Sequence, residues 1–343
     1  MDFNYQKICS DLLEDLPERT KGVISHRFGL LSVEESPGVK SPKRKTLQAI
    51  GKDYGITRER VRQIQNDGFL KLRDKKKKYQ KTFQYFTNYL KEQGGLQKES
   101  GLLPKLGGEK FKSHIFFLLT IGDQFDRTSG TKEFYPLWLI HRDYLASAQK
   151  TIDYFYKVLE KAGQPLTQKE LLDKGKGNSS NLSYAALISY LQASKKIKQN
   201  AEGLYGLSDW PEINPRGIKD KAYLVFKKEN KPLHFREATS LISDLFPQEA
   251  LSQTVHNELI RDSRFVLVGR GLYALKEWGY TPGVVKDIIF RILGESKEPL
   301  ARKEIVEKVL EQRFVKENTI LVNLQNKEYF FKTPDKRYTI REA

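Results

Sequence analysis

Arg58, Glu59, Arg62 and Gln63 are the residues whose types and spacing best suit a defined chemistry, the reading of DNA bases. Arginine can bond both acceptors of guanine, glutamine pairs with adenine, and glutamate accepts a hydrogen bond from the cytosine amino group. On a helix, these four positions fall largely away from the apolar stripe. The pattern predicts a base-reading surface, and an ordinary amphipathic helix with a solvated polar face is the alternative.

Two short helices must position these side chains. Thr46 is a good N-cap for a first helix, and Gly55 can end that helix in the left-handed conformation. Thr57 is a good N-cap for a second helix, whose buried stripe follows helical spacing at Val61, Ile64, Gly68 and Leu72. Two helices joined by a tight, glycine-containing turn form a helix-turn-helix, and its second helix enters the major groove N-terminus first.

A run of four lysines follows the second helix directly. Lysines neutralise DNA phosphates, and each such contact steepens the salt dependence of binding. We therefore expect phosphate contacts from this run, with a solvated helix end as the alternative: Lys75, Lys76, Lys77 and Lys78.

The composition is consistent with a polyanionic partner. The 343 residues include 60 Lys and Arg against 43 Asp and Glu, a formal charge of +17. The single cysteine, Cys9, excludes a disulfide framework and a cysteine-based metal site, and fits a reducing cytoplasm. The most apolar run, Ile115–Ile121, is far too short to cross a bilayer.

The segment around the helix-turn-helix resembles region four of the primary-type bacterial sigma factors. The resemblance rests on three stretches in the right order, LPERTKGVISHRFGL, LQAIGKDYGI and TRERVRQI, and covers Asp11 to Arg73. It implies binding to the upstream (minus-35) promoter element and contact with the β-subunit flap of RNA polymerase. By position, it implies base contacts from Arg58, Glu59, Arg62 and Gln63, and backbone contacts from Lys52, Thr57 and Arg60.

Two features depart from that family. Leu31–Lys45 is longer than the family's usual loop and carries two prolines and basic residues. The sequence also shows no counterpart of the sigma region that binds the polymerase clamp and melts the minus-10 element. We therefore expect a protein that is not a complete sigma factor and does not initiate transcription alone.

The second half of the sequence repeats. Three stretches each read as a helix, a Pro-Leu pair, two further helices and two short strands joined by a turn, which is the order of a winged helix. We interpret Pro165, Pro232 and Pro299 as helix-entry signals. Phe83–Ile140 is a weaker fourth copy. In the closing strands Tyr205, Tyr273 and Tyr338 are expected to be core residues.

The second copy resembles the HARE-type winged helix. The stretch GLYALKEWGY at Gly271–Tyr280, with KPLHFREATSLI before it, carries this resemblance. The family includes the N-terminal domain of the δ subunit of RNA polymerase, and the resemblance implies an adaptor facing DNA or polymerase without catalysis.

The predicted fold is mainly α with small β-wings: an N-terminal helix-turn-helix domain followed by tandem winged-helix units. The predicted domains are residues 1–80, 81–150 (a degenerate winged helix), 151–212, 217–280 (HARE-type) and 281–343. The five histidines show no metal-ligand spacing, and no phosphate-binding loop or nucleophile elbow occurs. We therefore expect no enzyme activity, no cofactor and no metal.

The sequence predicts a DNA-binding, transcription-associated protein of the bacterial cytoplasm, associated with the nucleoid. Its expected partners are promoter-like double-stranded DNA and the RNA polymerase core, with no membrane partner. Two alternatives remain open at this stage. One is an interaction adaptor that holds polymerase without reading bases, and the other is a DNA-targeting component of a defence or restriction system.

Overall fold

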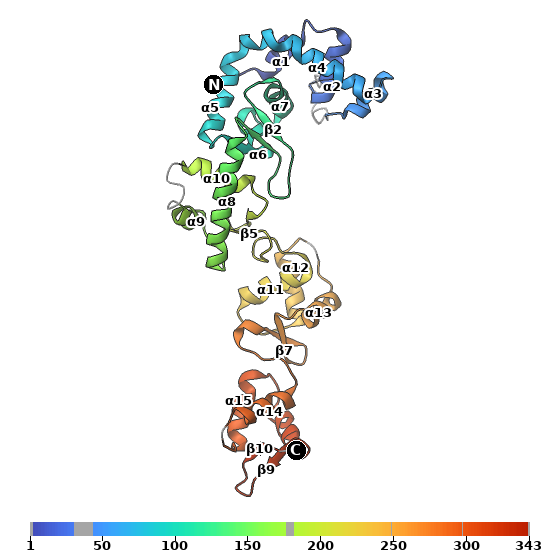
Figure 1. The fold of residues 1–343 in the computed structure, drawn as a ribbon. Helices are drawn as coiled ribbons and strands as arrows, with labels where there is room; N and C mark the ends of the chain where they lie inside the picture. Colours follow the sequence, from blue (N-terminus) through green and yellow to red (C-terminus); the bar gives the residue numbers. More distant parts are fainter. Residues whose placement is uncertain (1–2, 31–43, 176–181, 248, 297, 342–343) are drawn as a thin grey trace. The chain divides into compact units, whose positions relative to one another are not determined.

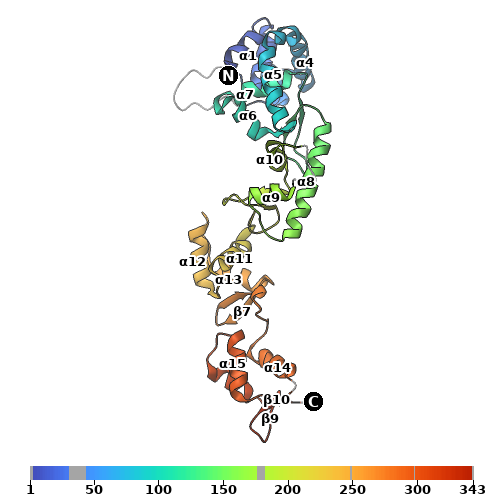
Figure 2. The ribbon, with the colours of Figure 1, turned by 90° about the vertical axis from the view of Figure 1, so that its left-hand side faces the viewer.

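The computed structural model describes residues 3–30, 44–175, 182–247, 249–296 and 298–341. The chain divides into two compact units, Met1–Asp209 and Trp210–Ala343. Both consist mainly of helices with small antiparallel sheets, as the sequence predicts (Figures 1 and 2). In the described residues, no helix is long and apolar enough to cross a membrane.

Four helices begin the first unit: α1 (Tyr5–Leu13), α2 (Glu18–Phe28), α3 (Leu47–Tyr54) and α4 (Arg58–Lys75). The predicted caps are confirmed. The Thr46 side chain accepts a hydrogen bond from the Ala49 amide, and the Thr57 side chain accepts one from the Arg60 amide. Gly55 ends α3 in the left-handed conformation, with φ at 63°. The chain therefore turns tightly from α3 into α4, as a helix-turn-helix requires.

The helix-turn-helix has a small apolar core of its own. Val23, Ile50, Val61 and Ile64 are buried, and they are partly covered by Leu47, Tyr54 and Ile56. The predicted buried stripe of α4 is confirmed, because the buried residues of this helix are Val61, Ile64, Gly68 and Leu72. Burying this stripe leaves the polar side chains of the first turns of α4 exposed.

A second, larger core joins the first four helices to the segment that follows them. It runs from Tyr5 to Trp138 and contains residues of α1, α2, the end of α4, α5 (Gln80–Glu92), α6 (Glu99–Gly107) and α7 (Lys112–Ile121). Residues 1–80 and 81–150 were predicted as separate domains, yet they share this core. The apolar face formed by α1, α2 and the end of α4 is therefore covered by the following segment, α5–α7.

Four segments repeat one order of elements. The first contains α5, β1 (Leu96–Lys98), α6, α7, β2 (Asp126–Thr128) and β3 (Leu137–Leu139). The second contains α8 (Asp143–Ala162), α9 (Gln168–Gly175), α10 (Tyr184–Ala193), β4 (Ile197–Gln199) and β5 (Tyr205–Leu207). The third contains α11 (Gly217–Glu229), β6 (Leu233–His234), α12 (Phe235–Leu245), α13 (Ser252–Arg261), β7 (Phe265–Gly269) and β8 (Leu272–Leu275). The fourth contains α14 (Val285–Glu295), α15 (Arg302–Gln312), α16 (Glu317–Leu324), β9 (Phe330–Lys332) and β10 (Tyr338–Ile340).

The sheets of the first and third segments have the same strand order. In both, the short strand after the first helix pairs with the last strand, which also pairs with the strand before it: β1-β3-β2 and β6-β8-β7. Similar bridges join Leu166 to Tyr205 and Leu300 to Tyr338 in the other two segments. The segment predicted as a degenerate copy thus follows the complete element order.

The Pro-Leu pairs have a role that differs from the predicted one. We interpreted their prolines as helix-entry signals, but the leucine after each proline pairs with the closing strand. Leu233 lies opposite Tyr273, just as Leu166 and Leu300 lie opposite Tyr205 and Tyr338. A proline without an amide N–H is tolerated at the start of an edge strand, and each helix begins two residues after the leucine.

Hydrogen bonds also join the second segment to the first. The Ser189 hydroxyl donates to the carbonyl of Leu96 at 2.7 Å, and the Tyr190 hydroxyl donates to the carbonyl of Gly94 at 2.7 Å. The predicted boundary at residue 150 lies inside α8, a 20-residue helix. These bonds explain why residues 1–209 form one unit.

Candidate nucleic-acid interface

Two glycines allow the helices of the helix-turn-helix motif to pack closely. The Ile56 amide donates to the Gly51 carbonyl at 2.9 Å. A Cβ on Gly51 would lie 2.6 Å from the Ile56 carbonyl oxygen, so only glycine fits here without a backbone shift. A Cβ on Gly68 would lie 2.7 Å from the Ile24 side chain, which shows how closely α2 packs on α4.

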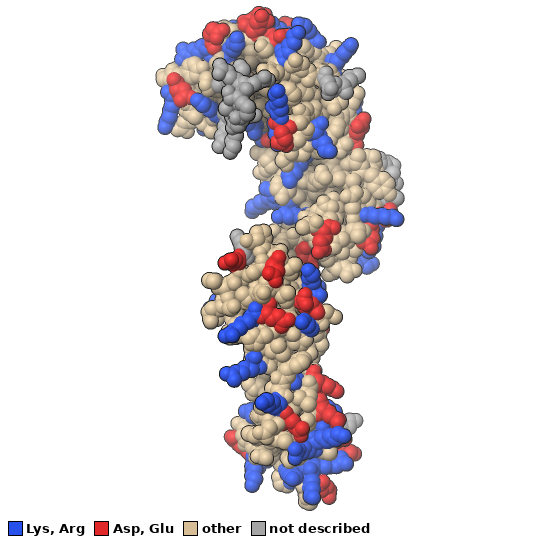
Figure 3. Space-filling view, turned by 180° about the vertical axis from the view of Figure 1, so that it is seen from behind, with Lys and Arg blue, Asp and Glu red and all other residues tan. Residues whose placement is uncertain are grey.

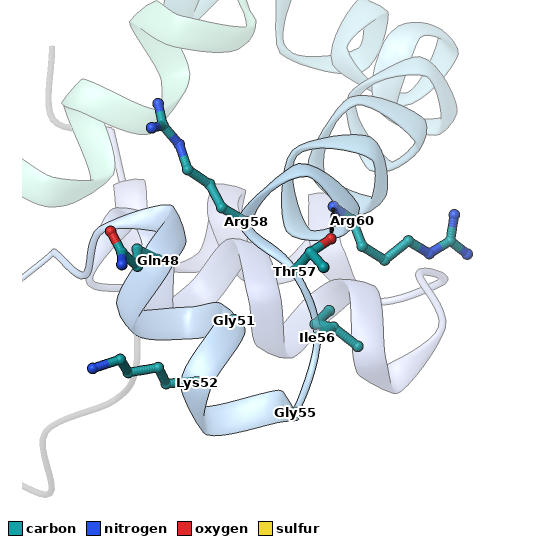
Figure 4. A pocket seen from close by; sticks show the side chains of 8 residues that line it. All are labelled: Gln48, Gly51, Lys52, Gly55, Ile56, Thr57, Arg58 and Arg60. Atoms are coloured by element: carbon teal, nitrogen blue, oxygen red, sulfur yellow. Dashed lines mark hydrogen bonds between the residues drawn. The ribbon is translucent and has the colours of Figure 1, made fainter.

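An open hollow lies between α3 and the start of α4 (Figure 4). It is lined by Gln48, Gly51, Lys52, Gly55, Ile56, Thr57, Arg58 and Arg60. Arg58 and Arg60 point in different directions, as positions two apart on a helix must. These two side chains therefore suit contacts with different groups of a bound duplex.

The predicted base-reading residues all lie exposed in the first two turns of α4. Two of them form an ion pair, with Arg62 Nη2 at 2.6 Å from Glu59 Oε1, and Arg62 Nε donates to the same carboxylate. Arg60 donates to the Gln63 side-chain oxygen at 3.1 Å. The structure thus orients these side chains in pairs along the helix surface.

The ion pair fixes the charge of both partners. The hydrogen bond from Arg62 lowers the pKa of the Glu59 carboxyl below its ordinary value, and the same bond raises the pKa of Arg62. A carboxylate that stays ionised remains an acceptor, which is the role that cytosine recognition needs.

The four lysines behind α4 have protein partners. Lys76 donates to Asp123 at 2.6 Å and to the Ile121 carbonyl at 3.0 Å, and its side chain is only 15% exposed. Lys75 pairs with Asp15. Lys77 pairs with Asp74 and Lys78 approaches Asp11, but both lysine side chains remain about three-quarters exposed, at 76% and 74%.

The predicted phosphate role therefore changes along this run. Lys76 links the end of α4 to the end of α7, so we revise its assignment from a phosphate contact to a structural link. Lys77 and Lys78 keep exposed amines. From the sequence alone the four lysines are indistinguishable. It does not reveal which side of the 3-10 helix at Lys76–Tyr79 packs against the protein.

Sequence reasoning missed Gln48, which lines the hollow beside Lys52. The signal was present, since Gln48 lies four residues before Lys52 and therefore one helical turn away. The long loop singled out as a departure, Leu31–Lys45, lies outside the described residues except for Arg44 and Lys45.

Fold and surface together define a helix-turn-helix protein whose second helix exposes polar, base-reading residue types at its N-terminus. The family described as Sigma-70, region 4 matches residues 12–74 of this chain. The resemblance drawn from the sequence is thereby confirmed for this segment. The HARE-type resemblance of the third segment is a proposal.

Curated relatives agree over the same segment. The chain is 47% identical over 62 residues to the RNA polymerase sigma factor RpoD of Helicobacter pylori strains 26695 and J99. It is 42% identical over 66 residues to the RNA polymerase sigma factor sigB of Arabidopsis thaliana. The matched stretch is 18–19% of this chain but only 8–10% of these relatives.

Proposed function

We propose that this protein binds double-stranded DNA in a sequence-dependent manner and acts in transcription. The observation that carries the proposal is the sigma region four match on residues 12–74, with Arg58, Glu59, Arg62 and Gln63 exposed at the N-terminus of α4. In this proposal these four residues contact base edges. Lys52, Thr57 and Arg60 contact the flanking phosphates, together with Lys77 and Lys78.

The remaining segments act in this proposal as a scaffold of winged-helix units without catalysis. Their shared order of helices and hairpins supports the winged-helix assignment. The domain limits 217–280 and 281–343 and the HARE-type character of the third segment belong to the same proposal. Because the matched segment is only 8–10% of these sigma factors, the protein is proposed as a partial counterpart and not as a complete initiation factor.

RNA polymerase is the second proposed partner, because the matched relatives are polymerase sigma factors by name. The shared core limits how polymerase could be held. Leu12, Ile24 and Phe28 are buried against the chain's own α5–α7 segment, so this apolar face is not available to another protein. DNA binding through the exposed side of α4 is therefore the better-supported function.

Selection of binding sites from a pool of randomised duplexes tests the proposal. The full-length protein should enrich a short motif that resembles a minus-35 element, and the Arg58→Ala variant should not enrich it. Recovery of duplexes without a common motif, by a protein shown to be folded, would contradict base reading. A parallel sedimentation assay with purified RNA polymerase core tests the second partner directly.

A further inference from the structure

Two arginines from separate stretches of the first unit lie over one aromatic ring, and a third arginine lies near them. The Cζ atom of Arg44 lies 3.9 Å from the centre of the Phe116 ring, and that of Arg127 lies 5.2 Å from it. Arg27, at the end of α2, donates to the carbonyl of Lys45 at 2.9 Å and so lies beside the backbone next to Arg44.

We infer that Arg27, Arg44 and Arg127 form a phosphate-binding site for the DNA backbone, and that the segment after the helix-turn-helix thereby takes part in DNA binding. The inference deepens the proposed function and rests on it. Arg127 lies in β2, outside the residues matched by the sigma region four family, so that family does not supply this contact.

The charges of the cluster favour an anion. Glu99 pairs with Arg127 at 2.5 Å, and it is the acidic partner of the cluster among the described residues. Three guanidinium groups against one carboxylate leave a local excess of two positive charges. Burial, followed by repulsion from Arg44 and Arg127, lowers the pKa of Arg27, as expected where like charges gather without enough counter-charge.

The geometry of the cluster is fixed in advance. The guanidinium groups of Arg44 and Arg127 both lie over the Phe116 ring, and Glu99 accepts two hydrogen bonds from Arg127. Guanidinium groups present forked donors that match phosphate oxygens, so a preset cluster loses little side-chain freedom when it binds. Exposure agrees with this role, since Arg44 and Arg127 reach the surface and Arg27 is half-buried.

A chain of contacts places the cluster next to the helix-turn-helix. Lys45 follows Arg44 directly, accepts the bond from Arg27 at its carbonyl, and pairs with Asp53 at 2.9 Å. Asp53 lies on α3 beside Lys52, which lines the hollow at the start of α4. A duplex seated on α4 would therefore pass a second basic site on the same unit.

On the face seen in Figure 3, Lys and Arg side chains are mixed with Asp and Glu. Net positive charge spread in this way supports weak, general attraction to DNA. A defined phosphate contact instead needs several donors close together, and Arg44 and Arg127 both lie over the Phe116 ring.

The test compares DNA binding by the full-length protein and its Arg127→Gln variant across a salt series. Both a minus-35 duplex and a scrambled duplex are used. The variant should weaken binding to both duplexes alike, by roughly threefold to tenfold, and lower the salt slope by about 0.9. Arg142→Gln, which removes an exposed arginine at the start of α8, should change neither value.

Arg44→Gln protects the test against misfolding, because it leaves the pair between Arg127 and Glu99 in place. It should lower the slope by a similar amount. A wild-type slope in both folded variants would overturn the inference, even if the wild-type protein prefers the minus-35 duplex. If the wild-type protein shows no preference for the minus-35 duplex, the proposed function is refuted instead. Failure of the inference and failure of the proposed function therefore give different results.

Titration with inorganic phosphate distinguishes the other source of the same chemistry. The DNA proposal predicts only weak binding of free phosphate, which does not compete with the duplex at matched ionic strength. Tight phosphate binding that is lost in Arg127→Gln, together with an unchanged DNA slope, would show a site for a free anion and overturn the proposal.

Discussion

The helix after the turn has a different surface in the N-terminal motif and in the repeated segments. In α4, the first two turns expose Arg58, Arg60 and Arg62. The corresponding helix of each repeated segment lacks such a group. α10 (YAALISYLQA) carries no charged residue, α16 (ENTILVNL) carries no basic one, and α13 has its arginine at the far end, at Arg261.

Packing explains part of this difference. In α7, Ile115, Phe117, Leu118, Leu119 and Ile121 are buried in the core that α1 and α2 also line. In α10, Ser189 and Tyr190 bond to the backbone near β1. The side chains of α7 and α10 thus contact neighbouring elements, while the polar side chains at the start of α4 are exposed to solvent. One arrangement of helices thus buries the third helix in some segments and leaves the proposed recognition surface exposed in another.

Loss of the small helix-turn-helix core gives the largest expected effect. Ile50→Ala removes buried methyl groups and should cost about 2–5 kcal/mol of local stability. Hydrogen exchange of α3 and α4 amides should report the loss, and sequence preference should disappear with it. Ile305→Ala, which truncates an equally buried side chain in α15, should destabilise the second unit and leave DNA preference intact. A loss of preference in that control would show that recognition is not confined to the first unit.

Removal of one base-reading side chain should have the next largest effect. Gln63→Ala should reduce the preference for the minus-35 duplex by about 1–3 kcal/mol, because a bidentate contact is lost. Competition between matched and mismatched duplexes measures this preference. Gln253→Ala in α13 is the matched control and should leave the preference unchanged. Equal weakening of every duplex by Gln63→Ala would place this residue on the backbone.

Neighbouring lysines in the run are expected to have different roles, one in DNA binding and one in stability. Lys77→Gln should lower the salt slope by about 0.9 without changing sequence preference, since its amine is exposed. Lys76→Gln should instead reduce thermal stability, because it leaves Asp123 without its partner and removes a bond to the Ile121 carbonyl. The opposite pattern in the two variants would contradict the revised assignment.

The smallest expected effect is that of pH. The Glu59 pKa lies below its ordinary value of 4.5, since Arg62 stabilises the charged form. The interaction is therefore complete above that value and is lost only as the pH falls through the lowered pKa. Discrimination by the protein should stay constant from about pH 5 to 8. An NMR titration of Arg62→Ala should show the Glu59 pKa rising toward 4.5.

Much of the local structure could be predicted from sequence, because caps and apolar spacing act over a few residues. Thr46, Gly55 and Thr57 marked the helix ends correctly. The core shared by residues 1–80 and 81–150 could not be predicted, because it depends on residues far apart in the sequence, such as Tyr5 and Trp138. The cluster at Phe116 was missed for the same reason, since its arginines are far apart in sequence.

Short-range patterns can also mislead. A proline before a helix is typical of the first helical turn, but here Pro232 precedes a strand residue whose partner, Tyr273, lies about forty positions later in the sequence. No local rule indicates that pairing. The same limit applies to Lys76, whose partner Asp123 lies in the turn after α7.

The central claim is that α4 reads sequence. Fluorescence anisotropy of the full-length protein tests it most directly, with a minus-35 duplex and a scrambled duplex compared across a salt series. We predict a preference of about tenfold or more, or about 1.4 kcal/mol, that persists near physiological salt. Equal affinity for the two duplexes, with a steep salt dependence for both, would contradict base reading and leave phosphate contact alone.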